Sequence, residues 1–355
     1  MKIKLFYLYL FLFLSLIILI IYNIIRSTKK AKKKKKPLPQ INKYYYNSTH
    51  CSSDLYKICI NCMEIGENAH PHCKDCPSSL ILKGYKIKTP DETLDELINK
   101  NKSIVRFGDG EFEIIFGDDI PFHNATKKLT KKLNEILQSD EKDLLIGIAN
   151  AINPEYIDKY VYSAKDFWNY YNELNKFKLY NLLNQSKQYY SASITRFYFD
   201  YIDKSFIPEY VSKLKKIWDK KDIVIVEGEK SRLGIGNDLF DNAKSIQRII
   251  CPSENAFFLY DKILEETLKV SKKKLILLAL GPTAKVLGYD LYKYGYQVID
   301  VGHVDIEYEW YRMNAQTKLP VKNKYVNEAR GVGGISNISD VEDVNYYKQI
   351  ISKVL

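Results

Sequence analysis

An arginine and two carboxylates stand close together in the stretch R-F-G-D-G-E, residues 106–111. Asp109 and Glu111, at positions i and i+2, point to the same side if this segment is extended. Carboxylates placed in this way can hold Mg²⁺ or Mn²⁺ with positions left open for phosphate oxygens, and Arg106 could contact a phosphate. A polar turn at the end of a strand would have the same composition, so the motif alone does not establish a metal site.

A second polar stretch, residues 227–238, mixes glycines with Lys230, Ser231 and Arg232. Backbone N–H groups and cations of this kind suit an anionic ligand. The stretch is neither a P-loop nor a G-x-G-x-x-G fingerprint, so ATP or NAD is not indicated, and a solvated polar loop is the alternative. Thr283 opens a predicted helix and is placed to cap it near a phosphate or a base, although a simple strand–helix turn would look the same.

A third stretch, residues 302–310, carries His303, Asp305 and Glu307 at alternate positions. One face of an extended segment would then present three titratable groups, and these residue types serve as general acids and bases. A single histidine is more often structural. Three such neighbours after one strand favour a catalytic role.

Each of these polar stretches follows a predicted strand. Short runs rich in Ile, Val and Leu predict strands at residues 103–107, 144–149, 222–227, 275–280 and 297–301. Amphipathic stretches between them predict helices at residues 90–99, 125–139, 208–220, 254–269 and 284–293. This alternation predicts a mostly parallel α/β sheet that is covered on both faces. Ligands of such sheets bind beyond the carboxyl ends of the strands, which is where the polar stretches fall.

Five strings of the chain carry a family resemblance. In chain order they are R-F-G-D-G-E (106–111), G-E-K-S-R-L-G-I-G-N-D-L-F-D-N-A-K-S-I (228–246), C-P-S-E-N-A-F (251–257), L-G-P-T-A (280–284) and G-H-V-D-I-E-Y-E-W (302–310). Together they resemble the GT-D type glycosyltransferases, which are nucleotide-sugar-dependent enzymes known mainly from bacterial glycoprotein and surface-glycan assembly. The match runs in register from about residue 83 to residue 314.

The resemblance implies a single Rossmann-like domain that takes a UDP-sugar, typically UDP-glucose, and holds Mn²⁺ or Mg²⁺ through the D-x-E motif at Asp109 and Glu111. It places the nucleotide-sugar contacts at Arg106, Lys230, Ser231, Arg232, Asn237 and Thr283, and it places His303, Asp305 and Glu307 near the sugar. Cys251 falls in a matched stretch and is expected to serve packing.

The expected mechanism follows from the leaving group. Cleavage of the sugar–phosphate bond develops negative charge on UDP, which a cation and a positive side chain would stabilise. The acceptor hydroxyl must lose a proton, and Asp305 or Glu307 is the expected base if the enzyme inverts the configuration of the sugar.

The first 43 residues differ from the rest of the chain. They contain eleven Lys and Arg and no acid, which accounts for the whole net charge of +11, so a body that binds nucleic acid is not expected. Residues 5–25 are uncharged and long enough to span a bilayer, so residues 1–26 are interpreted as a retained transmembrane signal-anchor, with a cleaved signal peptide as the alternative. The basic residues after this run favour a body on the cytosolic face, with the Golgi or ER lumen as the alternative.

Residues 27–80 form a predicted basic, cysteine-rich stem. Two CxxC pairs, Cys59 with Cys62 and Cys73 with Cys76, could supply four thiolates to one structural Zn²⁺. Disulfide bonds are the alternative. The two questions are coupled, because a cytosolic body predicts zinc and a luminal body predicts disulfides.

The sequence therefore predicts a membrane-anchored protein with a catalytic domain at residues 81–355. This domain would move a hexose, with glucose as the first candidate, from a UDP-sugar to a hydroxyl of a glycan or glycoprotein with the help of a metal ion. The alternative is a catalytically inactive membrane adaptor that binds a nucleotide-sugar and has a zinc-binding stem.

Overall fold

The computed structural model describes residues 84–329 and 344–355. The predicted anchor, the stem and its four cysteines (Cys59, Cys62, Cys73 and Cys76) therefore lie outside the described residues. Within these two ranges, no helix combines the length and the apolar character that a membrane crossing requires.

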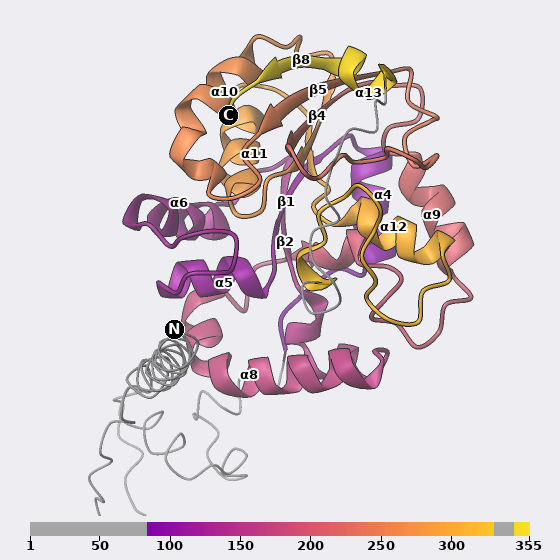
Figure 1. The fold of residues 1–355 in the computed structure, drawn as a ribbon. Coiled ribbons are helices and arrows are strands. Elements are labelled where there is room, and N and C mark those ends of the chain that lie inside the picture. Colours follow the sequence, from indigo (N-terminus) through magenta and orange to yellow (C-terminus); the bar gives the residue numbers. More distant parts are fainter. Residues whose placement is uncertain (1–83, 330–343) are drawn as a thin grey trace, which may run out of the picture. The chain divides into compact units, whose positions relative to one another are not determined.

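The described residues form one eight-stranded sheet, in which all neighbouring strands run parallel (Figure 1). The strand order is β3-β2-β1-β7-β6-β4-β5-β8. The chain leaves β1 towards β2 and β3, and it builds the other half of the sheet after that, so β1 and β7 lie where the winding of the sheet reverses. The strands are β1 (Ser103–Phe107), β2 (Leu144–Ile148), β3 (Tyr190–Ser191), β4 (Asp222–Gly228), β5 (Ser245–Cys251), β6 (Leu275–Ala279), β7 (Val298–Asp300) and β8 (Ile350–Lys353).

Helices cover both faces of this sheet, and the mostly parallel α/β fold predicted from the sequence is confirmed. Helices α6, α10 and α11 lie on one face, and α4, α9 and α12 lie on the other (Figure 1). The α-helices described are α4 (Pro90–Asn99), α5 (Asp109–Phe116), α6 (Lys127–Gln138), α7 (Pro154–Ile157), α8 (Tyr162–Leu182), α9 (Ile207–Lys215), α10 (Tyr260–Leu268), α11 (Thr283–Lys293), α12 (Val304–Arg312) and α13 (Val344–Gln349). Short 3₁₀ turns occur at Asn150–Ile152, Ala192–Thr195, Ala256–Leu259 and Asn327–Ala329.

The strands bury side chains on both faces, because the helices leave neither face open to water. In β4, Val224 and Val226 pack into the cluster under α6, α10 and α11, whereas Ile223 and Ile225 pack into the cluster under α4, α9 and α12. This alternation follows from the two-residue period of a strand. It explains why the strands appear in the sequence as continuous apolar runs.

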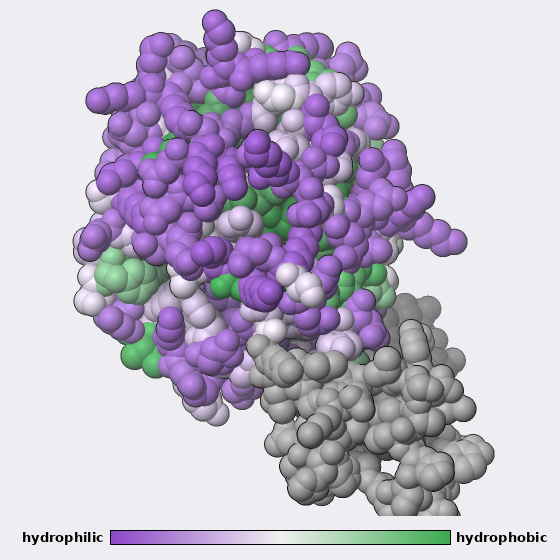
Figure 2. All heavy atoms as spheres, turned by 180° about the vertical axis from the view of Figure 1, so that it is seen from behind, coloured by the Kyte–Doolittle hydropathy of each residue, from purple (hydrophilic) through white to green (hydrophobic). Residues whose placement is uncertain are grey.

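The outer surface has a different composition from these two layers. Seen from the side opposite to Figure 1, the surface is mainly hydrophilic, and apolar side chains form small patches separated by polar ones (Figure 2). Among the exposed apolar side chains, Tyr162, Phe167, Tyr170 and Leu174 all belong to α8.

The predicted elements agree with the structure within a few residues, with three kinds of exception. Strands β3, β5 and β8, the long helix α8 and the short helices α7 and α13 were not predicted. The predicted helix at 254–269 begins as a 3₁₀ turn and becomes α-helical at Tyr260, and the one at 208–220 ends as an α-helix at Lys215. Two segments that were interpreted as extended, around residues 109–111 and 303–307, belong to helices α5 and α12.

Gly288 of α11 provides a test of the packing between this helix and the sheet. A Cβ atom at this position would lie 2.8 Å from Cγ1 of Val105 and 3.3 Å from Cδ1 of Leu278. We expect Gly288→Ala to lower the free energy of unfolding by about 1–3 kcal/mol, because strand side chains cannot move away freely. Urea unfolding of the full-length protein measures this change.

Gly110 of α5 is the matched control. A Cβ atom there meets its nearest neighbour, Cδ1 of Ile120, at 3.5 Å, which is an ordinary contact. We expect Gly110→Ala to be neutral or stabilising by up to about 1 kcal/mol, as alanine is preferred to glycine within helices. Equal effects of the two substitutions would contradict the packing described for α11.

Candidate active site

Arg106 of β1 is tied to the end of β7 inside the sheet. Its Nε atom donates to the main-chain oxygen of Asp300 at 2.6 Å, and Nη2 contacts Oδ1 of the same residue at 3.2 Å. Its Nη1 atom donates to the main-chain oxygen of Ala192 at 2.8 Å and to Oγ1 of Thr195 at 2.5 Å. A Cβ atom on Gly302 would lie 2.2 Å from Nη2, so only glycine leaves room for this arginine. The predicted phosphate contact is therefore engaged with the protein itself.

A buried lysine that the sequence did not single out completes this cluster. Nζ of Lys285 lies 3.2 Å from Oδ2 of Asp300, 2.8 Å from Oε1 of Glu111 and 3.1 Å from the main-chain oxygen of Gly281. Burial alone would raise the pKa of Asp300, but Lys285 and Arg106 hold it below its usual range. The Asp300 carboxylate is therefore ionised at neutral pH and links β7 to α11 and β1.

The expectation that Asp109 and Glu111 share one face is wrong. The chain enters α5 directly after Gly108, and successive helical residues are 100° apart, so positions i and i+2 point about 200° apart around the axis. Oε2 of Glu111 turns back to accept the N–H of Gly108 at 2.9 Å, which is a capping-box contact. Acidic residues in a first helical turn are also favoured by the helix dipole, so the local sequence stabilises a helix here.

Of the two carboxylates Asp109 and Glu111, only Asp109 has oxygens that are not already paired with another described residue and could bind a metal ion. Both oxygens of Glu111 are engaged, one by Lys285 and one by the N–H of Gly108. Asp109 makes no ion pair with any described residue, and burial raises its pKa, opposed by the nearby charge of Arg196. No group of three or more His, Cys, Asp and Glu that could hold a metal occurs in residues 84–329 and 344–355. Asp109 fits a Mg²⁺ or Mn²⁺ that takes its other ligands from phosphate and water.

The residues His303, Asp305 and Glu307 also lie in a helix and not on one face of an extended segment. His303 is the N-cap of α12, and both acids lie in its first turn. Asp305 and Glu307 consequently point to different parts of the protein, Asp305 towards the loop after β4 and Glu307 towards residues 198–199.

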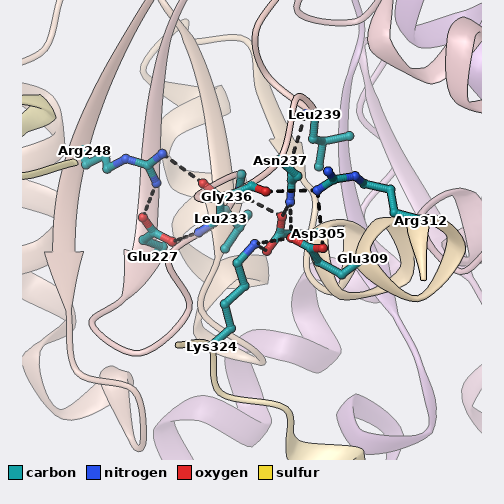
Figure 3. Close-up of polar contacts among 11 residues, drawn as sticks. Glu227, Leu233, Gly236, Asn237, Leu239, Arg248, Asp305, Glu309, Arg312 and Lys324 are labelled. Atoms are coloured by element: carbon teal, nitrogen blue, oxygen red, sulfur yellow. Dashed lines mark hydrogen bonds and ion pairs between the residues drawn. The ribbon is translucent and has the colours of Figure 1, made fainter. Parts of the chain in front are cut away.

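Asp305 is at the centre of a buried, fully bonded network (Figure 3). Its Oδ1 atom accepts the N–H of Gly234 at 2.9 Å and Nδ2 of Asn237 at 2.7 Å, and its Oδ2 atom accepts Nζ of Lys324 at 2.7 Å. Asn237 and Lys324 both also contact Oε1 of Glu309, at 2.6 and 3.0 Å. The side chain of Asn237, a predicted nucleotide contact, is thus used to hold this loop against α12.

Glu307 has a less complete set of partners. The side chain is fully buried, and its Oε2 atom accepts the N–H groups of Tyr198 and Phe199 at 2.8 and 3.1 Å. Its Oε1 atom accepts no hydrogen bond from the described residues and lies 3.9 Å from Nη1 of Arg196. Burial raises the pKa of Glu307 to about 7, although Arg196 opposes the shift. A carboxyl group with a pKa near 7 is well suited to act as a general acid or base at neutral pH.

Arg196 and Glu328 are site residues that the sequence analysis missed. Nη1 of Arg196 lies 2.5 Å from Oε1 of Glu328, and Nε2 of His303 lies 3.8 Å from the same oxygen. Burial and the charge of Arg196 lower the pKa of His303 to about 3, so its ring is neutral at neutral pH. Neither missed residue belongs to a motif string, and no local signal distinguishes either from a surface charge.

The polar loop after β4 is organised by a second buried ion pair. Glu227, the penultimate residue of β4, contacts Nη1 of Arg248 on β5 at 2.5 Å, and both side chains bond the main chain of Leu233 (Figure 3). Arg232 has a φ of +48° and is buried. Its Cζ atom lies 4.5 Å from the centroid of the Tyr346 ring. Its Nε atom has no hydrogen-bond partner among the described residues.

The other predicted nucleotide contacts lie around this loop and at the start of α11. Lys230 and Ser231 are partly exposed, and their N–H groups bond Oγ of Ser253 and the main-chain oxygen of Gly228. Thr283 is fully buried, and its Oγ1 atom lies 3.0 Å from Nε2 of His123.

Cys251 is fully buried at the end of β5, and burial raises its pKa to about 12. It packs within the apolar cluster under α6, α10 and α11. This environment agrees with the packing role expected from the sequence.

Comparison with known proteins decides the family. A family model described as the glycosyltransferase GT-D fold matches residues 104–329. The chain belongs to the GT-D glycosyltransferase family. It is 40% identical to glycosyltransferase GlyD of Streptococcus pneumoniae serotype 4 over 279 residues, which are 76% of this chain and 33% of that protein. It is also 40% identical to the probable glycosyl transferase Gly of Streptococcus gordonii over 239 residues, 67% of this chain and 35% of that protein.

Solved structures of similar proteins also superpose well on this chain. A structure of the domain of unknown function 1792, described as having a distinct glycosyltransferase fold, is 39% identical with a TM-score of 0.70, covering 79% of this chain and all of that one. A second, described as a new glycosyltransferase from Streptococcus sanguinis, is 36% identical with a TM-score of 0.71, covering 76% of this chain and all of that one. The chain spans about a third of the length of the curated relatives it matches.

In this GT-D chain the predicted site residues form separate groups. In the first group, Arg106 pairs with Asp300 and Glu111 pairs with Lys285, which also contacts Asp300. In the second group, Arg196 lies between Glu307 and Glu328, beside His303. The charge of Arg196 also acts on Asp109. The other predicted residues lie in neighbouring networks, which are Asp305 with Asn237, Thr283 with His123, and Lys230, Ser231 and Arg232 in the loop after β4.

Lys324 tests the network around Asp305. Replacing it with methionine leaves two buried carboxylates, Asp305 and Glu309, without their shared cation. We expect Lys324→Met to lower the free energy of unfolding of this GT-D chain by about 3–5 kcal/mol, the usual cost of an uncompensated buried charge. Urea unfolding monitored by fluorescence measures it.

Arg312 is the matched control because it pairs with the same Glu309. Its Nη1 atom lies 3.6 Å from Oε2, and its side chain is 42% exposed, so water already stabilises the guanidinium and Glu309 keeps Lys324 as its partner. We expect Arg312→Met to cost less than about 1 kcal/mol. If Lys324→Met were equally mild, the buried network would not be a stabilising unit.

Proposed function

We propose that this GT-D chain is an active glycosyltransferase that moves a hexose, with glucose as the first candidate, from a UDP-sugar to a hydroxyl of a glycan or glycoprotein. The observation that carries the proposal is a pair of unusual carboxyls at one strand edge. Asp109 and Glu307 both have a raised pKa, and the charge of Arg196 acts on both. Perturbed carboxyls of this kind are typical of catalytic sites.

The donor is expected beyond the carboxyl edge near β1 and β7, where the winding of the sheet reverses. Lys230 and Arg232, in the loop after β4, are the proposed contacts to the diphosphate, because Arg106 is engaged with Asp300. We place a Mn²⁺ or Mg²⁺ at Asp109 together with phosphate oxygens of the donor. Such an ion supplies positive charge at the leaving diphosphate. Glu111 would join it only by releasing Lys285.

Glu307 is the proposed base. Its Oε1 atom has no hydrogen bond within the described part of the chain, and a pKa of about 7 leaves a large share of the group ionised at neutral pH. Two main-chain N–H groups hold its other oxygen in place. Asp305, by contrast, accepts three hydrogen bonds, which supports a holding role. His303 is neutral and lies beside Arg196 and Glu328, which supports a role in positioning the sugar or its acceptor.

For residues before 84 the proposal rests on the sequence alone. Residues 5–25 would anchor the protein in a membrane with the catalytic domain on the cytosolic face, and Cys59, Cys62, Cys73 and Cys76 would bind a structural Zn²⁺. A luminal body with disulfide bonds in the stem is the alternative.

Donor use is tested with the full-length protein and a panel of UDP-sugars, with and without Mn²⁺, by measuring released UDP. We expect metal-dependent release from one donor. Asp109→Asn should reduce this release at least about 100-fold, because the proposed cation site loses its charge. Asp118→Asn, an exposed acid just after the same helix, should leave it unchanged.

If turnover needs a specific acceptor, no UDP will be released in this assay. Calorimetry then measures the binding of UDP with and without Mn²⁺. Binding of UDP that depends on Mn²⁺ and is weakened by Asp109→Asn would support the donor site even without release. If the wild-type protein bound no UDP, or if Asp109→Asn behaved as the wild type, the proposed donor and metal site would be wrong.

The role of Glu307 predicts a pH dependence. Turnover should rise as the pH increases through about 7, because only the ionised carboxylate accepts a proton. Glu307→Gln should remove this rise and lower kcat by about 100- to 10,000-fold. A pH–rate profile of both proteins measures it, and a variant that kept the wild-type profile would rule out Glu307 as the base.

The pH dependence of the free energy of unfolding tests the raised pKa of Glu307 independently of activity. The folded pKa of about 7 lies above the ordinary value of 4.5, so the folded state binds more protons than the unfolded state between these values. The free energy of unfolding of the wild type relative to that of Glu307→Gln should therefore fall as pH rises from about 5 to 7. The difference isolates Glu307, because His303, whose pKa is lowered to about 3, gives the opposite slope in both proteins.

A further inference from the structure

A hollow of about 970 Å³ lies beside α4 and α9, and none of the residues proposed for the donor or for catalysis lines it. Its walls come from α4, from residues 156–159, from residues 193–206 and from α9. This volume is near the upper end of the roughly 300–1,000 Å³ of small-molecule sites, so the hollow can hold more than one sugar ring.

Aromatic side chains form the floor of this hollow. Tyr201 and Phe206 pack edge to face with centroids 5.3 Å apart, and Phe206 packs in the same way on Tyr210 at 5.9 Å. The hydroxyl groups of Tyr156 and Tyr201 lie 3.0 Å apart. Mutual contacts of this kind favour one arrangement of the rings.

The rim of the hollow is acidic. Five carboxylates (Asp91, Asp95, Asp158, Asp203 and Glu209) line it against three lysines (Lys159, Lys213 and Lys216). Lys213 is already paired with Asp91 and Asp95 at 2.7 and 2.8 Å. An acidic rim disfavours a diphosphate, so the hollow is not suited to the donor. Carboxylates accept hydrogen bonds from neighbouring hydroxyl groups, and aromatic faces cover the C–H faces of sugar rings, so the lining suits a neutral carbohydrate.

One short segment of chain separates the hollow from the proposed active site. Ser193 and Phe197 line the hollow. In the same segment, Thr195 bonds Arg106, and the N–H group of Tyr198 holds Glu307. A ligand in the hollow therefore contacts the segment that positions the proposed base.

We infer that this hollow binds saccharide units of the acceptor, at a distance from the hydroxyl that reacts. The inference rests on the proposed glycosyltransferase function and adds to it a second carbohydrate site. An extended acceptor glycan would then be held at two places, by the active site and by the hollow. Discrimination between long and short acceptors would come from the hollow, because a single sugar cannot reach both.

The test uses an array of linear oligosaccharides of glucose, galactose and N-acetylglucosamine, probed with the full-length protein. Ser212, exposed on α9, lines the hollow, and Ser212→Trp would fill part of it. Ile202→Trp, at a rim position that is 64% exposed, is the second variant. Ser163→Trp places the same side chain on exposed α8, outside the hollow, and is the control.

We expect the wild type and Ser163→Trp to bind longer oligosaccharides of one composition, and both hollow variants to bind them at least about 10-fold more weakly. UDP binding should be the same in all four proteins, which shows that each is folded. Unchanged oligosaccharide binding in both hollow variants would overturn the inference, and so would a wild type that binds UDP but no oligosaccharide. A wild type that binds neither ligand would instead refute the proposed function itself.

Discussion

Arg106, Lys285 and Asp300 place two positive charges and one carboxylate inside the protein, where β1 lies beside β7. Buried charges of this kind are stable only when they are paired and hydrogen-bonded, because each has left water. Here the partners come from several elements: Arg106 reaches the 3₁₀ turn after β3, and Lys285 reaches the first turn of α5. Gly302 leaves the space that Arg106 needs before α12 begins. The elements that surround the site therefore cannot move independently of this cluster.

The carboxylates near the strand edge divide into two classes by their partners. Asp300, Asp305 and Glu111 each have both oxygens engaged by protein groups, so their role is to hold elements together. Asp109 and Glu307 are less completely partnered, and burial raises the pKa of both. A buried carboxyl group that lacks part of its hydrogen bonds in the free protein can form them with a bound substrate, and it then gains favourable free energy. This difference, and not proximity to a motif, separates the proposed chemical groups from the structural ones.

Sequence patterns predicted the sheet well, because β1, β2, β4, β6 and β7 are buried on both faces and consist of apolar runs. Strand β5 was missed because Gln247 and Arg248 interrupt its run, and the buried partner that makes Arg248 acceptable, Glu227, is 21 residues away. The D-x-E and H-V-D-I-E motifs follow strands β1 and β7 as expected, but the predicted directions of their side chains were wrong. Alternation of residues indicates a shared face only in an extended segment, and both segments are helical, with Gly108 and His303 at the N-cap positions. Arg196, Lys285 and Glu328 were missed since long-range contacts alone make them part of the site.

The same segment, residues 192–199, faces two different surroundings. On the side of the strand ends it meets Arg106 and places Arg196 beside Glu307, so its contacts there are ion pairs and hydrogen bonds. On the side of the hollow it meets aromatic rings and a rim with more carboxylates than lysines. Under the proposed function, the donor would meet the strand-end side of this segment and the acceptor the side of the hollow. Electrostatic complementarity mainly sets specificity and the rate of encounter, so the carboxylates of the hollow would act chiefly by excluding an anionic donor from it.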